Sequence, residues 1–256
     1  MGNGEDLKPK KGLRAALDIY KPNTKVLRFL VVLALSGIAA GLYKGIQDNY
    51  LAEIAGIGKF GRGLVEFFRE TPGLLVVLIL AWMYKFTDSR IFKIGIAVMA
   101  AGLIGLLLSG SSKIIVVVFM VVYSFGEHII MPVKTTISLD MAKRNQGGTA
   151  LGIAGAVGNV GSILGYLIVT VGFFLFAKFG FERNDIIPFK MIFAIAAALA
   201  IAAALVVFAL QDTALRGQRR RFYFAKKFVK YYMLEVFYGA RKQIFITFAP
   251  YVLILQ

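Results

Sequence analysis

The sequence contains no cysteine and a single histidine, His128, among its 256 residues. Without cysteine, the chain has no disulfide framework and no thiolate nucleophile. One histidine also excludes the H-E-x-x-H motif of metalloproteases, and the chain has no G-x-S-x-G motif of serine hydrolases. The catalytic constellations that are recognisable in a sequence are therefore absent, and an enzyme is not the predicted function.

Acidic residues are also scarce, since 14 aspartates and glutamates stand against 30 lysines and arginines, a formal net charge of +16. A nucleic-acid-binding protein would carry such an excess as a basic stripe on a soluble domain. Here the basic residues gather in the N-terminal segment and at residues 85–93, 143–144 and 216–242. These segments lie at alternate ends of successive apolar runs, as the positive-inside rule requires of cytoplasmic segments. The charge indicates membrane lipids, and no nucleic acid, as the partner.

Polar sequence is too scarce for a soluble protein, because 58% of the residues are hydrophobic. Apolar runs near the length of about 20 residues that crosses a bilayer recur along the chain. Six of them are predicted as transmembrane helices, at about residues 26–46, 63–86, 91–108, 113–139, 147–176 and 187–210. The predicted fold class is an all-α membrane protein in which residues 26–210 form a six-transmembrane-helix bundle.

The remaining segments are predicted from their polarity. Residues 1–25 are basic for too long to be the n-region of a cleaved signal peptide, so we expect a cytoplasmic tail. Residues 211–242 alternate apolar residues and lysines at helical period, which predicts a basic cytoplasmic amphipathic connector on the inner leaflet. Residues 243–256 begin an apolar run too short to cross a bilayer, so we expect a truncated seventh transmembrane helix.

The connection Asn49–Arg62 contains a formal G-x-G-x-x-G at residues 56–61. No predicted strand precedes it and no βαβ unit surrounds it, so nucleotide binding is not supported and no cofactor is predicted. We expect a flexible loop on the outer side of the membrane.

Small residues recur at intervals of three and four along the fifth run, so they share one face of a helix. These residues, named here the glycine ridge, are Gly148, Gly152, Gly155, Gly158, Gly161, Ser162 and Gly165. Glycine costs about 1 kcal/mol relative to alanine inside a helix. We therefore expect the ridge to make a compensating close contact with another helix.

Several ionisable residues lie within or beside the apolar runs, where such groups usually face a cavity or a transport pathway. The candidates for a substrate or coupling cavity are Lys44, Asp48, Glu66, Arg69, Glu70, Glu127, His128 and Lys134. Lys44 and Asp48 have the alternative interpretation of a self-neutralised pair at the outer interface, because they are four residues apart. Glu66, Arg69 and Glu70 form either a hydrated rim or the mouth of a cavity.

Glu127 lies about halfway along the fourth run, which places it near the membrane midplane. A carboxylate at that depth needs a partner, and we expect it from another helix, either Arg69 or Lys44. The alternative role is a structural carboxylate that is hydrogen-bonded to neighbouring helices.

Gly126 and Pro132-Val133, the turn and helix start 143–152, and the glycine-rich segment 158–165 resemble the fourth span, basic turn and fifth span of the major facilitator superfamily. That family carries a G-x-L-a-D-R-x-G-R-R signature in the cytoplasmic turn between its second and third spans. The corresponding turn here contains Asp88, Arg90 and Lys93. It departs from the pattern at Tyr84, Ser89 and Ile91, which stand for the first glycine, the arginine and the second glycine.

The resemblance covers about residues 26–256 and implies the N-terminal half of a secondary transporter that moves a small solute by alternating access. It also implies a multi-pass protein of the cell inner (plasma) membrane with a cytoplasmic N-terminus, and the missing C-terminal half as its partner. Proton coupling through Glu127 or His128 is one option. The alternatives are a complete six-span module acting as a homodimeric transporter or channel, and an intramembrane enzyme using Glu127 and His128 as an acid–base pair.

Overall fold

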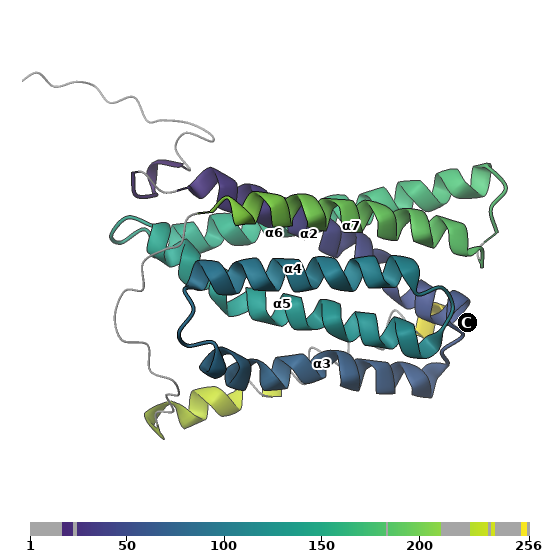
Figure 1. Cartoon of the computed structure of the whole chain (residues 1–256), viewed down its shortest axis with the longest axis horizontal. Helices are drawn as coiled ribbons and strands as arrows, with labels where there is room; N and C mark the ends of the chain where they lie inside the picture. The colour runs from purple at the N-terminus through teal and green to yellow at the C-terminus, as the bar shows by residue number, and fades with distance from the viewer. Residues whose placement is uncertain are drawn as a thin grey trace, which may run out of the picture.

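The computed structural model describes residues 17–22, 25–182, 184–210, 226–234, 237–238 and 252–254. Within these ranges, long helices lie side by side along the longest axis of the molecule (Figure 1). They are α2 (Val26–Asn49), α3 (Lys59–Trp82), α4 (Asp88–Leu108), α5 (Lys113–Met141), α6 (Gly147–Lys178) and α7 (Ile186–Phe208). A π-helix, η1 (Tyr50–Ile54), extends α2, and a short 3-10 helix, η2 (Lys226–Phe228), lies further along the chain. The all-α fold class is confirmed.

Five of the described helices are long and apolar enough to cross a membrane. These are the continuous helix Val26–Ile54 and helices α4, α5, α6 and α7. Helix α3 is 24 residues long but carries several charged residues in its first half. A multi-pass membrane protein is therefore shown, whereas the sixth span depends on how the charges of α3 are neutralised and stays a prediction.

The first connection is not the flexible loop that we expected. The first helix continues through η1 to Ile54 instead of ending near Ile46. Tyr50 explains the extension, because its buried ring packs against Phe189 and Phe193 of α7 with centroid distances of 5.6 and 5.0 Å. The turn is confined to the few residues before α3, where Gly56 adopts a left-handed φ of 60°.

Other helix boundaries differ from the predicted ones by a few residues. Helix α3 runs from Lys59 to Trp82, so it begins and ends about one turn earlier than residues 63–86. Helix α4 begins at Asp88 instead of Ile91 because the Thr87 side chain caps it, accepting a hydrogen bond from the backbone N–H of Arg90 at 3.2 Å. Capping residues are polar, so a hydropathy pattern places such a helix start too late.

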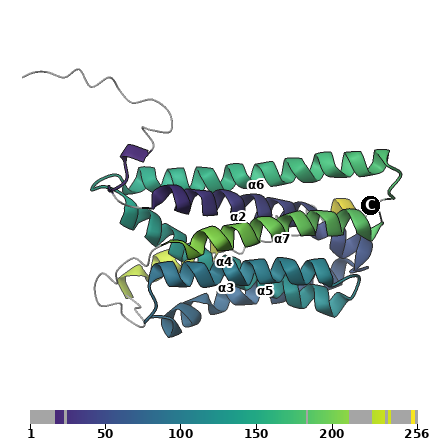
Figure 2. The same ribbon diagram turned by 45° about the horizontal axis from the view of Figure 1, so that its top comes forward.

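The long helices form two sequential triplets, α2–α3–α4 and α5–α6–α7, and most helix contacts join a helix of one triplet to a helix of the other. We call this pattern an exchange of contacts. Helix α2 packs mainly on α6 and α7, and α5 packs mainly on α4 and α3, while α4 also packs on α7. The first helix of each triplet therefore contacts the second and third helices of the other triplet. Helices α6 and α3 lie at opposite edges of the bundle in both views (Figure 2). Two three-helix repeats of inverted topology, as occur in transporter folds, are compatible with this exchange.

Residues 17–22 pack against the end of α5. The Lys21 N–H donates to the Met141 carbonyl and the Lys143 N–H to the Ile19 carbonyl, both at 2.8 Å, while Tyr20 is buried between them. The Lys21 Nζ also donates to the Asp140 carbonyl at 2.5 Å. The rest of the predicted tail, and most of the predicted connector 211–242 and seventh span 243–256, lie outside the described residues. These domain boundaries stay predictions.

Candidate functional site

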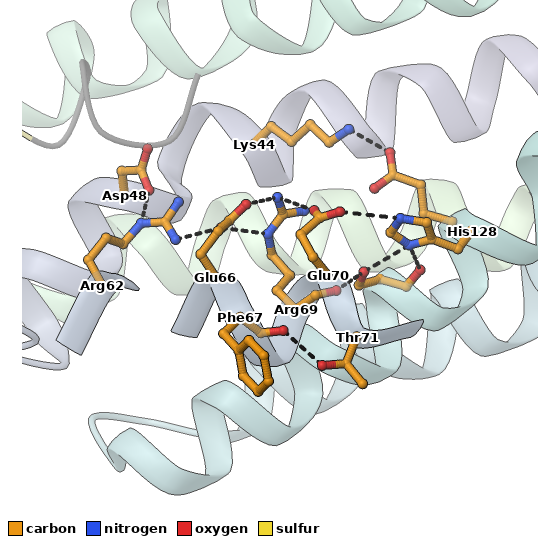
Figure 3. Close-up of polar contacts among 11 residues, drawn as sticks. Lys44, Asp48, Arg62, Glu66, Phe67, Arg69, Glu70, Thr71 and His128 are labelled. Atoms are coloured by element: carbon orange, nitrogen blue, oxygen red, sulfur yellow. Dashed lines mark hydrogen bonds and ion pairs between the residues drawn. The ribbon is translucent and has the colours of Figure 1, made fainter. Parts of the chain in front are cut away.

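The ionisable residues of α3 form a chain of ion pairs that joins α2 to α5 (Figure 3). Its first link is Arg62, whose Nε lies 2.9 Å from Oδ1 of Asp48 on α2 and whose Nη1 lies 2.7 Å from Oε2 of Glu66. Arg62 is only 2% exposed and Glu66 only 6%. Of the two interpretations of Glu66, Arg69 and Glu70, a hydrated rim does not fit Glu66, because its carboxylate is buried against the guanidinium of Arg62.

The chain continues along α3 through Arg69. The guanidinium of Arg69 forms a bidentate pair with Glu66, with Nε–Oε2 and Nη2–Oε1 distances of 3.0 and 2.5 Å. Its Nη2 also lies 2.6 Å from Oε1 of Glu70. Spacings of three and four residues place Arg62, Glu66, Arg69 and Glu70 on one side of α3, so one helix supplies most of the chain.

His128 of α5 ends the chain. Its Nε2 lies 3.5 Å from Oε2 of Glu70, and its Nδ1 lies 2.8 Å from the backbone carbonyl of Ser124. The Ser124 hydroxyl in turn donates to the Arg69 carbonyl at 2.5 Å, which adds a second tie between α5 and α3. Gly73 permits the approach of the imidazole, since a Cβ there would lie 2.6 Å from Nε2 of His128.

A separate ion pair joins α2 directly to α5. Nζ of Lys44 lies 2.5 Å from Oε1 of Glu127, and the two side chains are 39% and 18% exposed. Lys44 was one of the two partners predicted for Glu127, and this pairing is confirmed. The alternative pair of Lys44 with Asp48 is wrong, because Asp48 is held by Arg62 while the lysine extends to the other helix.

Two sets of predicted residues lie apart from these ion pairs. Lys134 is exposed on α5 and makes no ion pair with the described residues. The signature turn with Asp88, Arg90 and Lys93 forms the start of α4, at the opposite end of α3 from the ion-pair chain. The structure therefore gathers seven of the eight candidate cavity residues and leaves out Lys134.

The gathered charges nearly cancel. The three cations Lys44, Arg62 and Arg69 face the four carboxylates of Asp48, Glu66, Glu70 and Glu127. The set has one net negative charge when His128 is neutral and none when the imidazole is protonated. Buried charges are stable only when they are compensated, and the pairing within this group provides that compensation. Among the described residues, no three His, Asp or Glu side chains gather as metal ligands would.

Sequence reasoning missed Arg62 and a pair of tyrosines. Arg62 precedes Glu66 by one helical turn, and that spacing could have identified it. The rings of Tyr43 and Tyr123 pack at a tilt of 46° with centroids 4.1 Å apart, and both hydroxyls are buried without a hydrogen-bond partner in the described chain. Each tyrosine neighbours the ion pair between α2 and α5 in sequence, since Tyr123 lies one helical turn before Glu127.

The glycine ridge contacts α2 over only its second half. A Cβ on Gly161 would lie 2.8 Å from the Ala34 carbonyl oxygen, and one on Gly165 would lie 2.5 Å from that of Ile38. The Ser162 hydroxyl donates to the Gly37 carbonyl at 3.2 Å, and Gly37 lies against the backbone of Gly158.

The first half of the ridge makes no such contact. A Cβ on Gly148, Gly152 or Gly155 would meet no heavy atom of the described chain within 4 Å. The close contact expected there does not form, because these three glycines lie on a different side of α6 from Gly161 and Gly165, which face α2. Helix α6 runs along the edge of the bundle (Figure 2).

A family model described as Major Facilitator Superfamily matches residues 29–254. The match includes all the helices from α2 to α7 apart from the first residues of α2. Comparison with curated proteins gives no match.

Proposed function

Because the chain belongs to the major facilitator superfamily of membrane transporters, we propose that it forms one half of a secondary active transporter that moves a small solute by alternating access. In this family each half contains two inverted three-helix repeats, and the solute binds near the membrane midplane between the halves. The exchanged contacts of α2 and α5 support this arrangement.

The observation that carries the proposal is the ion pair between Lys44 and Glu127. It connects α2 and α5, which are the first helices of the two triplets. Glu127 is the central residue of the 29-residue helix α5, so it lies near the midplane if α5 crosses the bilayer. Ionisable groups at that depth usually mark a substrate or ion pathway. The partial exposure of Lys44 supports a location on the wall of a cavity.

We further propose that this pair couples solute movement to a proton. Protonation of Glu127 removes its charge and therefore its attraction to Lys44. The released ammonium group is then available to a polar or anionic group of the solute. In this scheme the ion-pair chain of α3 has a positioning role. It fixes α3 against α2 and α5 while Lys44 leaves Glu127 and contacts the solute.

The second wall of the cavity would come from a second helical bundle. Gly148, Gly152 and Gly155 form a strip of small residues on α6 that has no neighbour in the described chain. Such strips allow close helix approach within membranes. We propose that this strip contacts the C-terminal half of the transporter, in a plasma membrane with the N-terminus in the cytoplasm.

The complete transporter in liposomes tests the function. The liposomes contain a trapped pH dye, and a panel of sugars, amino acids and organic acids is added under an imposed pH gradient. We expect at least one solute class to increase the proton flux above that of protein-free liposomes and to accumulate inside. If no class accumulates although thermal unfolding shows a folded protein, the proposed transport function is wrong for the classes tested.

A further inference from the structure

A groove of about 640 Å³ opens between the first halves of α3 and α5. Its walls are apolar and include Leu64 and Phe68 from α3 and Ile114 and Val118 from α5. Among the described residues that line it, Lys113 is the one that carries a charge. The groove is therefore a different kind of site from the ion-pair chain.

The groove lies on the outside of the helix pair, away from the ionisable residues. Val118 precedes Glu127 by nine residues, which is about two and a half helical turns, so the two side chains leave α5 on opposite sides. Leu64 and Glu66 are similarly separated by about 200° around α3. Ile114 and Val118 are 77% and 51% exposed. In a membrane this outer surface faces lipid.

The dimensions and charge of the groove match one phospholipid. Its α5 wall extends from Lys113 to Val122, about 14 Å at 1.5 Å per residue. One leaflet contributes about half of the 30 Å hydrocarbon core, a similar length. Lys113 is the first residue of α5, and Lys59 is the first residue of α3 at the same end of the bundle. Both lysines are exposed and form no ion pair with the described residues.

We propose that this groove binds one acyl chain of an anionic phospholipid, whose phosphate group contacts Lys113. The bilayer supplies an apolar chain to the apolar walls, while a lysine near the membrane surface favours an anionic headgroup. By the predicted topology, the lipid belongs to the outer leaflet. The proposal does not depend on the transported solute.

Native mass spectrometry of the purified full chain in detergent tests the site. The chain is titrated with phosphatidylglycerol and, separately, with phosphatidylcholine that has the same acyl chains. We expect tighter binding of phosphatidylglycerol. Lys113→Gln should weaken phosphatidylglycerol binding about fivefold, the effect of one lysine near the surface, and leave phosphatidylcholine unchanged. Val118→Trp should weaken both lipids because the indole fills the groove.

Matched variants on α6 serve as controls. Val171→Trp introduces the same side chain at a position of 55% exposure, and Lys178→Gln removes a lysine at the same end of the bundle. Both should leave lipid binding unchanged. If Val118→Trp does not fold, Leu64→Trp fills the groove from α3, where the leucine is 49% exposed.

Three results would overturn the proposal. Equal weakening by the groove variant and by Val171→Trp would show that lipid binding is not local. Equal affinity for the two lipids would contradict the headgroup contact. A dimer mass that disappears in the groove variant would assign the groove to a second copy of the chain.

Discussion

Arg62 is the residue on which the junction of α2 and α3 depends most directly. Its guanidinium is buried and contacts carboxylates on two different helices, Asp48 and Glu66. The planar guanidinium of arginine donates to both from two nitrogens held in a fixed geometry, which the single nitrogen of an ammonium group does not provide. Removal of this one side chain leaves Asp48 without its cation and leaves Glu66 with Arg69.

Replacement of that cation should therefore destabilise the bundle strongly. We expect Arg62→Met to lower the free energy of unfolding by about 3–5 kcal/mol, the usual cost of breaking a buried ion pair from one side. Denaturant unfolding in detergent micelles measures the change. Adding Asp48→Asn should restore part of the loss, because the carboxylate that Arg62 neutralised on α2 is then removed.

The control is Lys143→Met, at an exposed cation in the turn after α5. It should change the stability by less than about 0.5 kcal/mol, as exposed substitutions usually do. An effect of Arg62→Met as small as that of the control would contradict the buried ion-pair chain.

Glu127→Gln tests the coupling role in the complete transporter. The amide cannot release or take up a proton at this position, so accumulation driven by a pH gradient should be lost while solute exchange is retained. Liposome uptake with and without the gradient measures both. Asp140→Asn, on the same helix, should behave like the parent. Gradient-driven uptake by the Gln variant at the parental rate would leave Glu127 with only a structural role.

At the scale of elements, α2 and α6 approach each other most closely through glycine. The contact involves Gly37 and Gly41 on α2 and Gly161 and Gly165 on α6. Backbone atoms lie where a side chain would otherwise be, so there is no flexible group that could move aside. The contact between α2 and α6 is therefore intolerant of added volume, whereas the space beside Gly148, Gly152 and Gly155 on α6 is open.

This difference predicts that a glycine-to-alanine substitution changes the stability in opposite directions at the two positions. Gly165→Ala should destabilise the chain by about 1–3 kcal/mol, because its Cβ would meet the backbone of α2. Gly152→Ala should stabilise it by up to about 1 kcal/mol, since alanine favours the helix and meets no neighbour. Thermal unfolding of the two variants in one detergent compares them. Effects of the same sign would remove the packing argument.

The sequence could predict the faces of elements but not their neighbours. A spacing of three and four predicted that the glycine ridge lies on one side of α6. Gly152 and Gly165, however, are thirteen residues apart, which is about 140° around the helix, and only Gly165 lies opposite α2. Likewise, Asp48 and Lys44 have the spacing of a pair on one helix. Their actual partners, Arg62 and Glu127, come from other helices, and such contacts depend on tertiary packing.

At the scale of the whole molecule, the order of the long helices in the described residues 26–208 could be predicted, because apolar runs of membrane length are visible in a sequence. The exchange of contacts between the triplets could not. It depends on which helices lie side by side, and the triplets share no pattern of residue types that would reveal it. The extension of α2 through η1 was also hidden, since only packing of Tyr50 on α7 favours it.

The orientation of the molecule in the membrane gives a further prediction. Ser111 precedes α5 and Asn145 follows it, so the two exposed residues lie at opposite ends of that helix. Because the chain has no cysteine of its own, Ser111→Cys and Asn145→Cys each provide a unique label site. In intact cells an impermeant thiol reagent should label the first and not the second. Labelling of both from outside would exclude this topology.

The hydrogen bonds that join residues 17–22 to the end of α5 also have a consequence for biosynthesis. Lys21 and its acceptor Asp140 are separated by 119 positions. A ribosome that adds 5–20 residues per second needs about 6–24 s to make that stretch. During this interval residues 17–22 lack their partners at the end of α5, and α2, α3 and α4 emerge before these hydrogen bonds can form. The N-terminal segment is thus positioned late, after α5 has been synthesised, although it leaves the ribosome first.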